Sequence, residues 1–456
     1  MTTRQGGPDT LPHTPRPPVA RRAAAGRIAP WLLLAALALL AGGCGESATT
    51  PEPVSVVARL TGLSGRQVAW STNIPTRGAV RYGFVSGQYD HFAWPTAAGG
   101  ADKAYSQSHT VPLLDDVTGR TVYFQCVDVT PEGFFAAARE TALTFAAAPA
   151  TAPLLRFTSI DVQFGDAHVL RLPTAGSVVA IDGGNPYVNR AGETAPQHVM
   201  RWLDDRAITR LDVALATHMH GDHVGGLLRD GTGGPGLLEH CQIGLYLDVP
   251  AVTGNANNQA AVNEILAARD ITKRVITPGM TSAGEPDALD WDPGVEVTVL
   301  NAGAQQEWRD GDLNNDSVVL KISYGSVDII TGGDCLVLGE TRILTNFPAA
   351  LAGVEYFKAS HHGRANANSL AYLLAIAPRV CLIPVAFIAY NEGPAQGAKD
   401  TAQTLERLGN LRADVFRFDV AEPLGRAQDN QTFWHTTFTT DGASYEVRIE
   451  PSIWGL

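Results

Sequence analysis

The chain has 456 residues, of which 45% are hydrophobic and 18% charged, a globular balance long enough for two or three domains. Its formal net charge of −12 argues against an extended basic surface for binding nucleic acid, so we expect no stable nucleic-acid partner. The 46 glycines and 28 prolines favour strand-rich over all-helical structure.

The first 44 residues have the pattern of an export signal. An arginine-rich stretch, with Arg16, Arg21, Arg22 and Arg27, precedes an apolar run over residues 31–40, which is too short for a permanent membrane span. The run ends at Gly42-Gly43-Cys44, which resembles the bacterial lipoprotein processing site. We therefore expect export, lipidation of Cys44 and anchoring to the bacterial cell envelope, periplasmic or at the cell surface. The alternative is an ordinary cleaved signal with an incidental cysteine.

The other cysteines form no Cys-x-x-Cys pair, which argues against a structural zinc knuckle. We expect most of them to be buried small hydrophobic residues, and their disulfide pairing is open. They are Cys126, Cys241, Cys335 and Cys381.

Residues 45–52 read as a polar tether, and residues 53–147 as a separate all-β unit. Short alternating segments at 65–72, 78–84, 119–129 and 140–147 favour a β-sandwich. The segment resembles a fibronectin type III domain, with Trp70 and Tyr123 at the family's core positions. Nothing in it looks catalytic.

An Ala/Pro-rich linker at 148–154 precedes a unit over residues 155–456 in which strands and helices alternate. This alternation predicts a layered α/β domain, separable from the all-β unit. Strands are expected at 155–163, 167–172, 177–184, 211–218, 295–300, 317–323, 327–334 and 379–386. Helices are expected at 197–207, 256–270, 367–377 and 401–409.

The segment ATHMHGDHVGG is the most informative stretch of the chain. A nearly all-apolar strand ends at Thr217, and four potential metal ligands follow within six residues: His218, His220, Asp222 and His223. Imidazole and carboxylate groups suit Zn²⁺, Mn²⁺ and iron ions. The spacing predicts a divalent metal centre of one or two ions, with zinc favoured.

This His-x-His-x-Asp-His pattern resembles the metallo-β-lactamase superfamily, and residues 155 to about 420 look most like the hydrolase domain of ComEC-type DNA-uptake proteins. Further matches are the Gly-Asp-Ala turn at 165–167, VVAIDGG at 178–184, the segment 314–334 and the His-His-Gly element at 361–363. The resemblance implies an αββα sandwich.

The resemblance also assigns roles to residues outside the main motif. Asp334 would bridge two metals, His361 or His362 would be a further ligand, with His362 favoured, and Asp182 and Asp166 would support the cluster from behind. Asp222 would orient the attacking water as well as bind metal. Arg364, where relatives usually carry Ser, is a possible substrate contact or a solvated surface residue.

One family histidine is missing, because Asn301 stands where the lactamases carry a further His. This casts doubt on β-lactam hydrolysis and on a tight two-zinc centre. We expect His240 to lie outside the site, and His168, His198 and His435 to be structural or surface residues.

The implied activity is an exported metal-dependent hydrolase, in which the metal lowers the pKa of bound water and hydroxide attacks the substrate. Phosphodiesters, nucleic-acid-like or smaller, are the favoured substrates. One alternative is hydrolysis of esters, lactones or phosphocholine-like groups; another is a non-catalytic surface binding protein. The oligomeric state is open.

Overall fold

The computed structural model of the protein describes residues 56–64, 66–145, 152–187, 189–190, 192–250, 256–303, 311–385, 394–418 and 434–452. The predicted export signal, Cys44 and the tether lie outside the described residues, as does most of the predicted linker. No helix in the described ranges is both long and apolar enough to cross a membrane.

The N-terminal part consists of seven strands in the described residues. They are β1 (Ala58–Ser64), β2 (Gln67–Gly83), β3 (His91–Ala93), β4 (Ser106–Pro112), β5 (Thr121–Val129), β6 (Phe135–Ala137) and β7 (Thr141–Thr144). The two strands expected at 65–72 and 78–84 are one long strand, β2. Its first half pairs with β1 and β4 and its second half with β3 and β5, with a register shift between Ser71 and Thr76. A bent strand that changes partners explains why the alternating pattern breaks in its middle.

Trp70 is buried in the core of these strands, but Tyr123 is only half-buried. The neighbours of Tyr123 in β5, Val122 and Phe124, point into the core instead, because side chains alternate across a strand. The expectation of Tyr123 as a core residue is therefore wrong. The fibronectin type III assignment itself stays a prediction.

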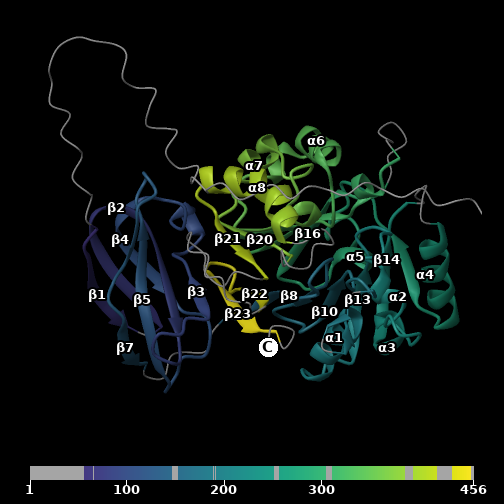
Figure 1. Cartoon of the computed structure of the whole chain (residues 1–456), viewed down its shortest axis with the longest axis horizontal. Coiled ribbons are helices and arrows are strands. Elements are labelled where there is room, and N and C mark those ends of the chain that lie inside the picture. Colours follow the sequence, from purple (N-terminus) through teal and green to yellow (C-terminus); the bar gives the residue numbers. More distant parts are fainter. Residues whose placement is uncertain are drawn as a thin grey trace, which may run out of the picture. The chain divides into compact units, whose positions relative to one another are not determined.

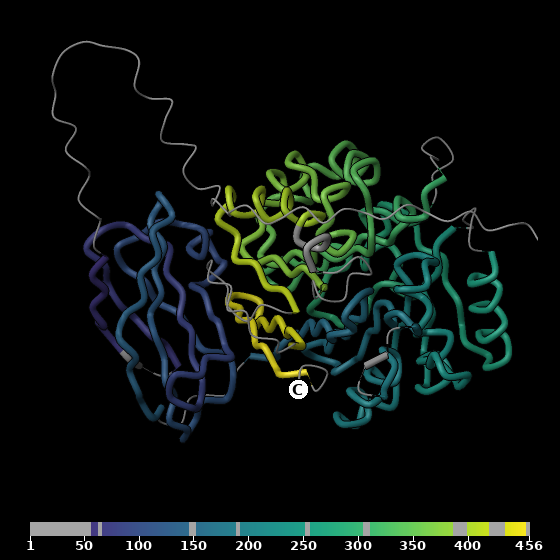
Figure 2. Tube along the Cα trace, viewed as in Figure 1, coloured from purple at the N-terminus to yellow at the C-terminus, as the bar shows by residue number. Residues whose placement is uncertain are grey.

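The remaining chain forms two sheets (Figures 1 and 2). The first has the order β15-β14-β13-β10-β9-β8-β22-β23 and continues through β3 into the N-terminal strands; the second has the order β16-β17-β18-β19-β20-β21.

The strands of the first sheet are β8 (Leu155–Ser159), β9 (His168–Arg171), β10 (Val178–Ile181), β13 (Arg210–Leu215), β14 (Gln242–Asp248), β15 (Thr272–Val275), β22 (Trp434–Thr440) and β23 (Tyr445–Pro451). Those of the second are β16 (Val295–Asn301), β17 (Val319–Tyr324), β18 (Val327–Thr331), β19 (Tyr356–Lys358), β20 (Val380–Ile383) and β21 (Asp414–Arg417). A small separate pair is formed by β11 (Asn189–Arg190) and β12 (Glu193–Thr194).

The helices cover the outer faces of these two sheets (Figure 1), except α5 (Pro286–Leu289), which contributes Ala288 and Leu289 to the core between the sheets. They are α1 (Ala195–Asp204), α2 (Gly225–Leu228), α3 (Leu237–His240), α4 (Ala256–Ala268), α5 (Pro286–Leu289), α6 (Val337–Asn346), α7 (Leu370–Ile376) and α8 (Pro394–Asn410). Helix α1 begins at a capping box, in which Thr194 and Gln197 satisfy each other's backbone N–H groups.

Three buried clusters define the layers. The largest joins the facing sides of the two sheets, with Phe157 and Leu215 from the first and Val297 and Ile329 from the second. A second lies between the first sheet and α1–α4, and a third between the second sheet and α6–α8. The order is helix, sheet, sheet, helix, and the predicted mixed α/β fold is confirmed.

Strand direction determines where polar side chains gather. Strands β10 and β13 are parallel neighbours in the first sheet, and β18 and β19 are parallel neighbours in the second. The carboxyl ends of parallel strands share one edge of a sheet, where polar groups from different strands can converge. Each of these four strands is followed directly by residues of the candidate site.

Candidate metal centre

The candidate ligands come from both sheets. The buried strand β13 leads into His218–His223, and β10 leads into Asp182. Asp334 follows β18, and His361 and His362 follow β19. The fold therefore brings together residues up to 180 positions apart, in the order expected from the sequence.

Four side chains form a compact cluster: Asp222, His223, Asp334 and His362. The Asp334 Oδ2 atom lies 3.2 Å from His223 Nε2 and 3.3 Å from His362 Nε2. The Asp222 Oδ2 atom lies 3.4 Å from His362 Nε2 and 3.8 Å from His223 Nε2. Ligand atoms arranged tetrahedrally at zinc-binding distance are roughly 3.3 Å from one another, so this spacing suits one metal ion.

Several atoms of the cluster are buried without a hydrogen-bond partner in the described part of the chain. They are His223 Nε2, His362 Nε2 and Asp334 Oδ1. Buried polar atoms are normally paired, because leaving one unpaired costs about 1–3 kcal/mol. A divalent cation would satisfy these atoms, so the residues present fit a metal.

The electrostatics of the cluster also favour positive charge. Burial alone would lower the pKa of His223 and of His362, but Asp334 and the neighbouring carboxylates raise the pKa of both well above its usual value. Burial would raise the pKa of Asp334, yet the two imidazoles hold it well below its usual value. Metal binding displaces protons from such ligands, so the cluster can exchange its protons for a cation.

His218 and His220 form a neighbouring pair outside this four-residue cluster. His218 Nε2 lies 2.9 Å from His220 Nδ1, and the His218 ring is centred 4.2 Å from the His223 ring. Burial, then the charge of His223, lowers the pKa of His218 well below its usual value. Imidazole nitrogens this close could together hold a second cation.

Two carboxylates, Asp182 and Asp166, lie behind the histidines and hold them in place. Both were expected to support the cluster. Asp182 accepts hydrogen bonds from the Thr217 backbone N–H at 2.7 Å and hydroxyl at 2.8 Å, and it lies 2.9 Å from His223 Nδ1. Asp166 Oδ1 lies 3.4 Å from His362 Nδ1. Carboxylates behind metal-binding histidines fix the ring orientation and raise ligand basicity.

Asp166 is itself paired with Lys358, and both side chains are fully buried. Burial would raise the pKa of Asp166, but Lys358, His168 and His362 lower it well below its usual value. The Lys358 ammonium also donates to the Gly333 carbonyl at 2.9 Å, next to Asp334. Lys358 thus connects the carboxylate behind His362 to the turn that carries Asp334.

The backbone is constrained around the site. Asp182, His361 and His362 all have positive φ angles, of 62°, 50° and 52°, which are uncommon for residues other than glycine. Gly165 has φ of 111° and packs so closely on the Asp222 carbonyl that a side chain there would clash. Such conformations persist where the surrounding structure enforces them.

His361 lies at the edge of the cluster. Its Nε2 atom is 3.9 Å from Asp334 Oδ2, and its Nδ1 atom is 2.8 Å from the Asn366 side-chain oxygen. The structure thus places His362 in the cluster and directs one nitrogen of His361 to the adjoining loop.

Arg364 lies near the centre, and Phe164 connects it to His362. The Arg364 guanidinium carbon lies 6.0 Å from the centre of the Phe164 ring, which is itself 5.0 Å from the His362 ring. Arg364 also lines a cavity of about 300 Å³ with Ala365, Asn366, Lys399, Asp400 and Gln403.

Asn301 has a structural role. Its amide donates to the carbonyls of Asn315 and Ser317 at 3.0 and 2.7 Å, and the Ser317 hydroxyl accepts from the Asp334 N–H at 3.0 Å. Asn301 therefore supports the segment that holds Asp334.

The remaining histidines singled out from the sequence have other partners. His240 pairs with Asp204 at a half-exposed position, and His168 packs behind the site against Ser159 and Asp166. His198 and His435 stack on each other away from the cluster.

Sequence reasoning did not single out Lys358, Thr217 or Phe164. A lysine at the end of an apolar strand was the one available signal for Lys358, because a charge there needs a buried partner. The roles of Thr217 and Phe164 depend on contacts between distant segments.

Comparison with family models finds no match, and comparison with curated proteins finds no similar sequence. Among solved structures, a new diphosphatase from the PhnP family is similar at 11% identity and a TM-score of 0.28, over 50% of this chain and 85% of its own. Unliganded yeast PDE1 is similar at 10% identity and a TM-score of 0.32, over 58% of this chain and 97% of its own. Both TM-scores are low, so the functional proposal rests on the geometry of the centre.

Proposed function

We propose that the protein is a metal-dependent hydrolase of the metallo-β-lactamase type that acts on phosphodiesters. The observation that carries this proposal is the buried cluster of Asp222, His223, Asp334 and His362, with nitrogen and oxygen atoms that lack partners among the described residues. A non-catalytic binding protein has no need for this arrangement beside the His218–His220 pair.

A divalent cation bound here would supply the positive charge that activates water and offsets charge on a substrate oxygen. Residues of the chain would orient the attacking water and the metal ligands. Asp222 is less buried than the other three, so its carboxylate can orient the attacking water as well as bind metal. Asp182 and Asp166 keep the imidazoles of His223 and His362 oriented throughout.

The cavity beside His361 favours a phosphate-containing substrate over a neutral ester. Arg364 and Lys399 both line it, and Asn366 adds an amide. A guanidinium donates two parallel hydrogen bonds to phosphate oxygens, and a neutral ester offers no charged pair of oxygens for this interaction. Asp400 on the same wall offsets part of this charge, so a small substrate fits better than a long polyanion.

The substrate class is tested by comparing bis-p-nitrophenyl phosphate with p-nitrophenyl butyrate. We expect metal-loaded protein to hydrolyse the phosphodiester, and Arg364→Gln to raise its KM more than it lowers kcat. Arg210→Gln is the matched control, because Arg210 is exposed and pairs with Asp212. Turnover of the butyrate alone would favour the ester and lactone alternative.

We further propose that the protein is exported and anchored through lipidated Cys44. The support is the arginine-rich start, the short apolar run and the Gly-Gly-Cys sequence. Cys44→Ser should move the protein from the membrane to the soluble fraction. Unchanged membrane association would contradict lipidation.

A further inference from the structure

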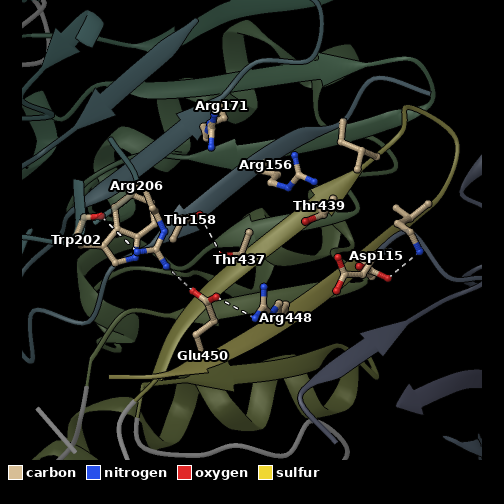
Figure 3. Close-up of a pocket in the computed structure, with 13 residues that line it drawn as sticks. Asp115, Arg156, Thr158, Arg171, Trp202, Arg206, Thr437, Thr439, Arg448 and Glu450 are labelled. Atoms are coloured by element: carbon tan, nitrogen blue, oxygen red, sulfur yellow. Dashed lines mark hydrogen bonds and ion pairs between the residues drawn. The ribbon is translucent and has the colours of Figure 1, made fainter. Parts of the chain in front are cut away.

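A second cavity lies on the outer face of the first sheet, away from the metal centre (Figure 3). In β8, Phe157 points into the core between the sheets, whereas Arg156 and Thr158 lie on the opposite face. The cavity has a volume of about 120 Å³. Leu114 and Asp115 line one part of it, and Trp202 and Arg206, near the end of α1, line another.

Strand register builds the floor of this cavity from two rows of neighbouring residues. In the first row, Arg171 on β9 faces Arg156 on β8, which faces Thr439 on β22. In the second row, Thr158 faces Thr437, which faces Arg448 on β23. The rows place arginines and hydroxyl groups side by side, and Figure 3 shows them along adjacent strands.

The acidic residues around the cavity already have partners. Glu450 pairs with Arg206 at 3.0 Å and with Arg448 at 3.1 Å. Asp115 pairs with His91 at 3.0 Å. Glu446 accepts hydrogen bonds from the Tyr82 hydroxyl at 2.8 Å and the Leu114 N–H at 3.0 Å. Asp115 and Glu446 still attract Arg156 electrostatically, but neither is close enough to form an ion pair with it.

The side chains of Arg156 and Arg171 form no hydrogen bond or ion pair with any residue that the structure describes. Like charges directly opposite each other on paired strands destabilise a sheet. Burial, and then the charge of Arg171, lower the pKa of Arg156, although Asp115 and Glu446 partly oppose this effect. An arginine stays protonated nonetheless, so the fold holds two repelling positive charges side by side.

We propose that this cavity binds a small phosphate-type oxyanion, inorganic phosphate or a phosphate monoester, between Arg156 and Arg171. An anion there would relieve the repulsion, and each guanidinium can donate two parallel hydrogen bonds to it. Thr158 and Thr439 supply hydroxyl groups nearby. The volume admits a phosphate group but no polymer, and none of the lining residues belongs to the metal centre.

The test is calorimetric titration of the full-length protein with inorganic phosphate, and with phenyl phosphate, after metal removal by EDTA. Metal removal excludes phosphate binding at the metal centre. We expect saturable binding by wild type and at least tenfold weaker binding by Arg156→Gln/Arg171→Gln. The Arg156→Lys/Arg171→Lys variant should lose part of the affinity, because an ammonium cannot bind in a bidentate manner. Arg210→Gln should bind as wild type does.

The melting temperature of each variant shows whether it has lost phosphate binding or has lost its fold. Removing two repelling charges should leave the melting temperature of the phosphate-free double variant at or above that of wild type. Arg171→Gln alone, at an exposed position, should also weaken binding. Wild-type binding that disappears with EDTA, or a double variant that binds phosphate as wild type does, would overturn the proposal. Preference for inorganic phosphate over phenyl phosphate would identify the free anion as the ligand, and the reverse a monoester.

Discussion

The Asp166–Lys358 pair shows how single buried residues hold the candidate centre. Both side chains are fully buried, and Asp166 also contacts His362. Removing one partner of a buried ion pair leaves an uncompensated charge, which is far more damaging than loss of a surface pair. The position of His362 thus depends on a lysine outside the metal motif.

Lys358→Met should therefore destabilise the protein by about 3–5 kcal/mol and reduce its metal content. Lys321→Met is the control, because Lys321 and its partner Asp328 are both partly exposed, so this change should cost less than Lys358→Met. Urea denaturation and elemental analysis measure the two effects. Equal stability of the two variants would contradict the role given to Lys358.

The spacing of His218, His220, Asp222 and His223 predicted one part of the site, and the family resemblance supplied Asp334, the His-His-Gly element and the supporting residues Asp182 and Asp166. The His-x-His-x-Asp-His segment, Asp334 and the His-His-Gly element each follow an apolar strand, which is visible in the sequence. Lys358 and Thr217 act through contacts with residues far away in the chain, and a local sequence pattern cannot predict such contacts. The role of Asn301 likewise depends on the carbonyls of Asn315 and Ser317.

At the scale of elements, buried and strongly periodic segments were predictable and exposed or distant ones were not. Helix α1 buries Val199, Met200 and Leu203, as its periodicity indicates. Strand β15 is exposed along its length and has no apolar signature. Strand β22 pairs with β8 across about 280 residues of sequence, so neither strand reveals its partner.

Strand β3 carries a titratable group that links stability to pH. Burial lowers the pKa of His91, but hydrogen bonds with Asp115 and Asp90 outweigh it and raise the pKa to about 9. Because the folded pKa lies above the ordinary value of 6.5, protonation stabilises the fold. This contribution is fully present below about pH 6.5 and is lost as the pH rises through 9.

His91→Gln should therefore cost more stability at pH 6 than at pH 9.5, measured by urea denaturation. Gln107→Ala, at an exposed side chain that does not titrate, should cost the same stability at both pH values. A His91→Gln penalty that is independent of pH would mean that the imidazole is neutral in the folded protein.

At the scale of the whole molecule, the N-terminal strands and the layered domain share a sheet. Strand β3 pairs with β23, and Phe92 and Trp94 belong to the core between the two layered sheets. The Trp94 Nε1 atom donates to Asp414 at 2.7 Å, and Arg379 donates to the Asp102 carbonyl at 2.9 Å. The boundary at 148–154 stays a prediction, but these contacts argue that the two parts stabilise each other.

A fragment of residues 155–456 should consequently melt at a lower temperature than the full chain. Trp94→Ala should destabilise the full chain by about 3–5 kcal/mol, because it removes a large buried ring. Phe134→Ala is the control, since Phe134 is 54% exposed. A fragment as stable as the full chain would show that the two parts fold independently.

The central claim is that the cluster around Asp334 binds metal and that the bound metal drives hydrolysis. The most direct test measures metal content and bis-p-nitrophenyl phosphate turnover together, in wild type, Asp334→Ala, His220→Ala and His240→Ala. We expect one or two transition-metal ions in wild type and in His240→Ala. Asp334→Ala and His220→Ala should lose metal and at least about a hundredfold in turnover, because ligand loss removes the charge that activates water. A wild-type protein that binds no metal under any loading condition would contradict the account, and so would full metal content and activity in Asp334→Ala.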